Sequence, residues 1–103
     1  MKQVYIGHWN NTRNQYPEFP MPVVGAQRDS QENIDKVKRI IAKAQPMYCK
    51  GWSNCRICGA SNGTIEYRYK ANKNTFFIIP EGYVHYLEEH NVQVDPLILE
   101  LSI

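Results

Sequence analysis

Cys55-Arg56-Ile57-Cys58-Gly59 is the stretch that decides the fold of this chain. Two cysteines separated by two residues can reach one ion from a single tight backbone turn. Gly59 follows the second cysteine, where the chain has to fold back, often through a conformation that glycine adopts at low cost. Because a lone pair of this kind is weak evidence, the prediction of an ion site needs a second pair of ligands.

The second pair is His85 and His90, which have four residues between them. This spacing lies in the range typical of paired zinc histidines. The 26 residues between Cys58 and His85 suit a strand, a turn and a second strand that returns the start of a helix to the cysteines. We therefore predict one structural Zn²⁺ held by Cys55, Cys58, His85 and His90.

Other interpretations of these residues remain open at this point. The histidines could be surface or helix-capping residues beside free, apolar cysteines. A redox dithiol is disfavoured, because nothing before Cys55 resembles the strand-to-helix junction that lowers a thiol pKa. Cys49 could be a spare ligand, a buried thiol, or a nucleophile with His85 as base, and the last lacks an orienting third group. Trp52 is expected to pack near the metal and shield the thiolates.

The spacing of the histidines makes a geometric demand on the predicted helix. Positions five apart on an α-helix differ by about 140° around its axis, so two such imidazoles do not converge. The helix must tighten or end before His90, and Asn91 tolerates the left-handed conformation that closes helices. Glu88 or Glu89 could orient a ligand imidazole.

The segment after the cysteines predicts a β-hairpin. Residues 64–70 alternate apolar and polar side chains, which is typical of a half-buried strand, and residues 75–79 form the apolar run of a central strand. Asn62-Gly63 predicts a tight turn before them. Pro80 is expected in the first turn of the second helix, with Tyr83, Tyr86 and Leu87 towards the core. Residues 97–103 are expected to form a closing strand.

The first half of the chain predicts a strand at residues 4–6 and an amphipathic helix from about Gln31 to Ala44, capped by Asp29 or Ser30. Three prolines within residues 16–22 exclude helix there and favour an extended surface segment anchored by Tyr16 and Phe19. The apolar face of the helix is expected to consist of Ile34, Val37, Ile41 and Ala44.

The predicted fold is α+β, in one small domain spanning residues 1–103. Residues 1–48 supply a strand, the proline-rich segment and the amphipathic helix. Residues 49–103 supply the zinc-binding half, a ββα-like unit made of a zinc knuckle, a hairpin and a short helix. The 103 residues, 43% of them hydrophobic, suit a single core. A chain this short buries a small core, so a bound metal ion would add to its stability.

Charge and composition restrict the classes of function. The net charge is +2, too small to indicate nucleic-acid binding by itself. Residues 1–50 carry eight basic and four acidic side chains, whereas residues 51–103 carry four basic and six acidic ones. No apolar run resembles a signal peptide or a membrane span, so we expect a cytoplasmic protein that does not bind membranes.

The second half also resembles a pattern found in small uncharacterised bacterial and phage proteins. The resemblance covers Gly51-Trp52-Ser53-Asn54-Cys55-Arg56-Ile57-Cys58-Gly59, then Asn62-Gly63-Thr64-Ile65-Glu66, then Pro80-Glu81-Gly82-Tyr83-Val84-His85-Tyr86-Leu87 and His90. It implies that the cysteine and histidine pairs occur together. It brings no activity with it.

Three functions are compatible with these residues. The first is a non-enzymatic protein-interaction module or inhibitor, since four protein ligands leave no position on zinc for an activated water. The second is nucleic-acid binding through the basic stripe Lys36, Arg39 and Lys43 and the hairpin residues 67–70. The third is a metal-dependent nuclease or hydrolase, for which Glu66, Glu88 and Glu89 are the candidate bases.

Overall fold

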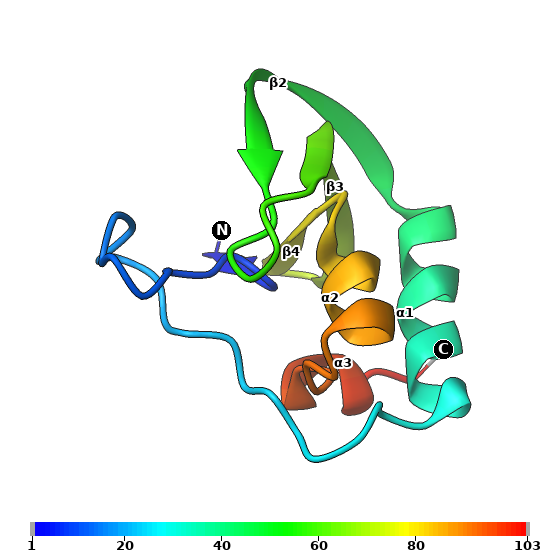
Figure 1. Ribbon diagram of the computed structural model, residues 1–103. Helices are drawn as coiled ribbons and strands as arrows, with labels where there is room; N and C mark the ends of the chain where they lie inside the picture. Colours follow the sequence, from blue (N-terminus) through cyan, green and yellow to red (C-terminus); the bar gives the residue numbers. More distant parts are fainter. Residues whose placement is uncertain (1, 103) are drawn as a thin grey trace.

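The computed structural model describes residues 2–102, apart from the side chains of residues 49–53. The described residues form four strands and three helices, which confirms the α+β class (Figure 1). The strands are β1 (Lys2–Tyr5), β2 (Gln45–Asn54), β3 (Ser61–Asn72) and β4 (Thr75–Pro80), and the helices are α1 (Gln31–Lys43), α2 (Tyr83–Glu89) and α3 (Pro96–Leu99). Within this part of the chain, no helix has the length and apolar character needed to cross a membrane.

The strands form one sheet in the order β1-β4-β3-β2. The predicted hairpin is confirmed as the antiparallel pair β3 and β4, with Tyr69 opposite Phe77. β1, which confirms the expected N-terminal strand, pairs in parallel with β4. β4 is therefore an inner strand, and its run Phe77, Ile78 and Ile79 is buried as its apolar sequence predicts.

β2 has no counterpart among the predicted elements. It pairs only with β3, so it forms one edge of the sheet, and its register shifts between Tyr48 and Asn54. Pro46 is compatible with an edge strand because a strand at the edge leaves backbone groups unpaired. The segment lacks the two-residue alternation that would have revealed it.

α1 begins where it was predicted. The Ser30 side chain caps the helix by accepting a hydrogen bond from the Asn33 backbone N–H at 3.2 Å. The predicted apolar face is confirmed for Ile34 and Val37, which are buried, and for Ile41, which is half-buried and packs against the core. It is wrong for Ala44, which lies beyond the last residue of the helix, and it omits Ile40, which is buried.

Two predicted turns are also wrong. Asn62 and Gly63 lie within β3, and the chain reverses between β2 and β3 at the cysteine turn itself. Gly63 keeps a left-handed backbone, with φ of 83°, at a register shift of the β2–β3 pair. Pro80 does not open the second helix: it ends β4 opposite Glu66, and α2 begins three residues later.

The predicted closing strand is a short helix, α3. The Asp95 side chain accepts a hydrogen bond from the Leu97 backbone N–H at 2.9 Å, and Pro96 occupies the first turn. This capping favours helix over the alternation of leucines. Ile98 is buried, whereas Leu97 and Leu99 are partly exposed.

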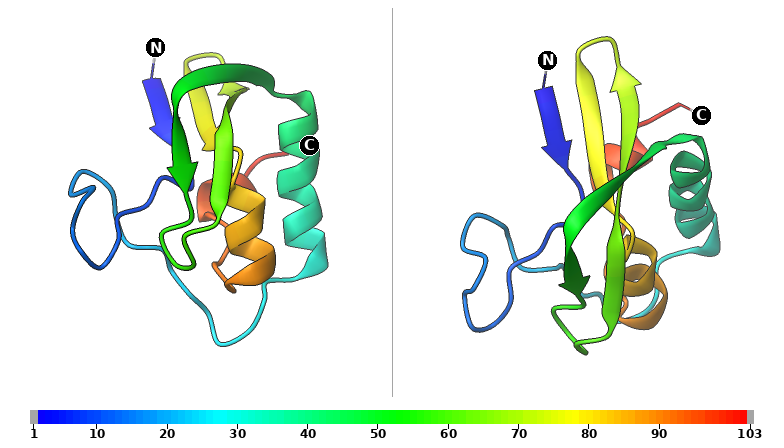
Figure 2. Two further views of the ribbon diagram at one scale, coloured as in Figure 1. Left: turned by 45° about the horizontal axis from the view of Figure 1, so that its top comes forward. Right: turned by 90° about the horizontal axis from the view of Figure 1, so that it is seen from above.

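The helices lie together on one side of the molecule, where α1 contacts α2, α3 and β3 (Figure 2). The loop of residues 7–22 lies at the opposite end, beyond β1. Tyr16 and Phe19 anchor this loop as predicted: the Tyr16 ring lies 3.9 Å from the Arg56 guanidinium, and the Phe19 and His8 ring centroids are 5.4 Å apart.

Candidate metal centre

The two cysteines lie in the tight turn that joins β2 to β3. The Cys55 N–H donates to the Ala60 carbonyl at 2.8 Å, and the Gly59 N–H donates to the Cys55 carbonyl at 3.0 Å. The Ile57 N–H donates to Cys55 Sγ at 3.4 Å. Gly59 has a φ of 78°, the left-handed conformation expected after the second cysteine.

The two histidines come from α2 and from its C-terminal cap. α2 ends at Glu89, so His85 lies on the helix and His90 leaves it with φ of −128°. Asn91 then takes the left-handed conformation, with φ of 54°, and the Val92 N–H donates to the Tyr86 carbonyl at 3.2 Å. The helix therefore ends where the five-residue spacing requires it to end, and the predicted geometry at His90 is confirmed.

These two segments bring Cys55, Cys58, His85 and His90 together. One ligand atom from each residue can be chosen so that all four lie within 4.8 Å of one another. Cys58 Sγ lies 3.4 Å from His85 Nε2, and the two imidazole centroids are 5.0 Å apart. A tetrahedral ion with Zn–S and Zn–N bonds of about 2.3 and 2.1 Å separates its ligand atoms by about 3.4–3.8 Å. The cluster is thus a Cys₂His₂ group that could hold a metal ion, and its ligand atoms would draw about 1 Å closer around one.

Burial supports the same interpretation. Cys55 is 3% exposed and Cys58 is exposed, so the group lies at the surface with one sulfur in the core. His90 Nε2 is buried and has no hydrogen-bond partner among the residues that the structure describes. A buried polar atom without a partner is costly, and a bond to a metal ion would supply one. The alternative of a simple capping histidine offers no such partner.

Residues around the group hold the turn against the helix. The Tyr86 hydroxyl accepts a hydrogen bond from the Arg56 backbone N–H at 2.7 Å, and burial raises the pKa of Tyr86 although this bond opposes it. Trp9 packs edge-to-face on the Tyr86 ring at 6.4 Å. No local pattern in the sequence predicts the contact of Trp9 with Tyr86 or the Tyr86–Arg56 bond, because the partners are far apart along the chain.

Several other sequence predictions about the site have different outcomes. Glu88 does not orient an imidazole: its carboxylate pairs with Lys38 Nζ at 3.0 Å. Glu89 is exposed. The predictions for Cys49 and Trp52 fall on side chains outside those that the structure describes.

The arrangement favours holding an ion over reacting at one. Four protein atoms fill a tetrahedron, whereas a catalytic ion keeps a position open for water or substrate. Of the candidate bases, Glu66 lies beside His8, with Glu66 Oε1 3.8 Å from His8 Nε2, and Glu88 is paired with Lys38.

Comparison with protein-family models, with curated proteins and with solved structures gave no match for this chain. A functional proposal therefore has to follow from the geometry of the site.

Proposed function

We propose that this chain is a small zinc protein in which Cys55, Cys58, His85 and His90 hold one structural Zn²⁺. The observation that carries the proposal is the convergence of four ligand atoms within 4.8 Å from two separate segments. Two thiolates and two imidazoles in a tetrahedron are the donor set that zinc prefers, and harder cations such as Mg²⁺ and Ca²⁺ prefer oxygen. A cytoplasmic setting, which keeps thiols reduced, fits this use of the cysteines.

The ion stabilises the fold by joining the cysteine turn to α2, two segments that are distant in the sequence. The cysteine turn is held by its own backbone bonds, and Tyr86 provides one hydrogen bond to it from α2. Four metal bonds would fix the turn on the end of α2. Because the ligands come together only in the folded chain, the free energy of metal binding adds to the free energy of folding.

We further propose that the protein acts through a protein partner, as an interaction module or inhibitor, and not as an enzyme. The closed ligand set supports this, because it leaves no position for substrate. Large apolar side chains on the surface also support it: Val23 is 65% exposed, Tyr48 81% and Ile57 45%. Ile57 stands in the cysteine turn, so a partner that covers it would contact the metal-bound part of the chain.

Nucleic-acid binding is the weaker alternative because key residues are engaged elsewhere. Lys36 Nζ donates to the carbonyls of Leu99 and Leu101, so two of its N–H donors are not available to a phosphate. Arg68 stacks on the Phe76 ring at 3.9 Å. Tyr67 and Tyr69 are half-buried and pack against the core, which limits the ring surface that stacking on bases requires.

Metal analysis of protein purified without chelator tests the zinc proposal. We expect one equivalent of zinc per chain, and replacement by Co²⁺ should give the absorption of a tetrahedral thiolate site. Less than about 0.2 equivalents after expression with added zinc would contradict the proposal.

Affinity purification from the source cells tests the partner proposal. A protein recovered at a stoichiometric ratio by the wild-type chain and lost with Ile57→Glu would support an interaction module. The exposed Lys73→Glu variant on the β3–β4 tip is the control. Sub-micromolar binding of nucleic acid at physiological salt, or hydrolysis of a phosphodiester by the zinc form, would favour an alternative.

A further inference from the structure

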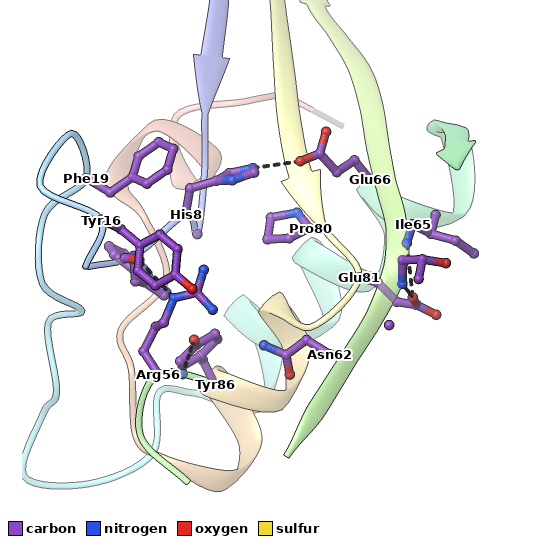
Figure 3. Close-up of a pocket in the computed structure, with 14 residues that line it drawn as sticks. His8, Tyr16, Phe19, Arg56, Asn62, Ile65, Glu66, Pro80, Glu81 and Tyr86 are labelled. Carbon is purple, nitrogen blue, oxygen red and sulfur yellow. Dashed lines mark hydrogen bonds and ion pairs between the residues drawn. The ribbon is translucent and has the colours of Figure 1, made fainter. Parts of the chain in front are cut away.

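A pocket of about 300 Å³ lies between the N-terminal loop and the end of the sheet (Figure 3). Loop residues Tyr16 and Phe19 form one wall, and Ile65 and Pro80 line the other side. None of the four predicted zinc ligands lines the pocket. It is therefore distinct from the metal centre, although Arg56 and Tyr86 belong to the surroundings of both.

One end of the pocket carries the Arg56 guanidinium. Arg56 Nε donates to the Trp9 carbonyl at 3.1 Å and Nη1 donates to the Asn54 carbonyl. The guanidinium plane is held over the Tyr16 ring, 3.9 Å from its centroid. These contacts fix its orientation and leave Nη2 free of bonds to the described residues, so it can pair with a carboxylate.

The other end of the pocket carries Glu66, which lies beside His8 in Figure 3. Glu66 Oε1 is 3.8 Å from His8 Nε2, beyond hydrogen-bond distance. Burial lowers the pKa of His8 although the Glu66 charge opposes this, so the imidazole does not neutralise the carboxylate at pH 7. The Glu66 side chain is 31% exposed, so its carboxylate can accept N–H donors from a ligand.

Arg56 and Glu66 are the charged groups of the lining that a ligand can pair with. Glu81, the remaining carboxylate, already accepts the N–H groups of Thr64 and Ile65 at 3.1 and 3.3 Å. Asn62 and Trp9 are each 8% exposed, and Asn62 Oδ1 and Trp9 Nε1 lie too deep in the protein to contact a ligand. A cationic and an anionic group in the same pocket therefore favour a ligand that carries both charges.

We propose that this pocket binds a small zwitterion of the α-amino acid class, with its carboxylate on Arg56 and its ammonium group on Glu66. An ammonium group donates three N–H groups, and a carboxylate accepts them through two oxygens. The apolar walls at Phe19 and Pro80 receive the side chain. The volume of about 300 Å³ accommodates a single amino acid. This binding site does not depend on the proposed partner.

Binding of leucine and phenylalanine, followed by NMR signals of the His8 imidazole and the Trp9 indole, tests the proposal. N-acetylleucine, which lacks the ammonium group, and leucinamide, which lacks the carboxylate, are the matched probes. Because each loses one charge-assisted pair, each should bind about 10- to 100-fold more weakly than leucine.

The Glu66→Gln variant tests the proposed pairing of Glu66 with the ammonium group, because glutamine has nearly the shape of glutamate but no charge. It should weaken leucine binding while leaving N-acetylleucine binding unchanged, and Glu100→Gln, an exposed carboxylate in the C-terminal segment, is the control. Absence of shifts with either amino acid up to about 20 mM would show that water alone fills the pocket and would overturn the proposal. Equal affinity for leucine and its two blocked forms would overturn it as well.

Discussion

Cys58→Ala separates metal binding from packing more cleanly than any other change of a ligand. Cys58 is exposed, whereas Cys55 is in the core, so loss of the Cys58 side chain by itself should cost less than about 0.5 kcal/mol. Structural zinc contributes about 10–16 kcal/mol through four ligands, or roughly 2.5–4 kcal/mol for each ligand. The variant should therefore bind metal roughly 50- to 1000-fold more weakly than the wild type.

Competition between the protein and a chelator of known affinity, read from the Co²⁺ absorption and its displacement by Zn²⁺, measures this loss. Thermal unfolding gives a second readout: with zinc, the variant should melt more than about 10 °C below the wild type. In excess chelator the two chains should melt together, because the exposed thiol contributes little without metal.

Ile57→Ala is the matched control, since Ile57 is the exposed neighbour in the same turn and is not a ligand. It should keep the wild-type metal affinity. The assignment of Cys58 as a metal ligand would be refuted if Cys58→Ala bound metal as tightly as the wild type. It would also be refuted if Cys58→Ala and Ile57→Ala lost the same amount of metal affinity.

Three further predictions concern the supporting structure. Asp29 accepts the Val94 N–H at 3.0 Å. Burial by itself would raise the pKa of Asp29, but this bond and others like it lower it. Asp29→Asn should therefore lower the free energy of unfolding by about 0.5–1.5 kcal/mol at pH 7. Because the native pKa is lowered, this difference is present above pH ~3.9 and vanishes as the pH falls through the native pKa, which urea unfolding at several pH values checks. Gly59 has a φ of 78°, so Gly59→Ala should lower the free energy of unfolding in urea by about 1–2 kcal/mol. Gly59→Asn should lower it by less. Burial raises the pKa of Tyr83, so ultraviolet titration should show no ionisation of Tyr83 before the chain unfolds. The Tyr83 hydroxyl accepts the Asp95 N–H at 3.0 Å, so Tyr83→Phe should lower the free energy of unfolding by about 1–3 kcal/mol.

The sequence predicts well those elements in which the apolar residues recur with the period of a helix or a strand. The alternation in residues 64–70, the apolar run in residues 75–79 and the spacing in residues 31–44 each follow from local burial, and the structure has β3, β4 and α1 there. The Cys₂His₂ group was predictable for a related reason. Each pair of ligands lies within one short segment, and the segment between the pairs has the length of a hairpin.

The features that the sequence misses depend on partners remote in the chain. β2 forms because β3 supplies hydrogen bonds to it. The side chains of residues 45–54 have no periodicity that predicts this pairing. The leucine alternation near residue 98 was misleading, because Asp95 caps a helix there. The pocket joins residues 7–19, 56, 62–66 and 80–86, so no single spacing could have indicated it.

Arg56 belongs to the surroundings of both the proposed metal centre and the pocket, so a bound ion would also affect ligand binding. Arg56 directly follows the proposed ligand Cys55, and its backbone N–H donates to the Tyr86 hydroxyl at 2.7 Å. Its side chain leaves this turn to stack on Tyr16 in the pocket. An ion that fixes the turn against α2 therefore also fixes the start of the Arg56 side chain. A guanidinium held in place loses less entropy when it pairs with a carboxylate, so a closed and unreactive metal site can still strengthen ligand binding beside it.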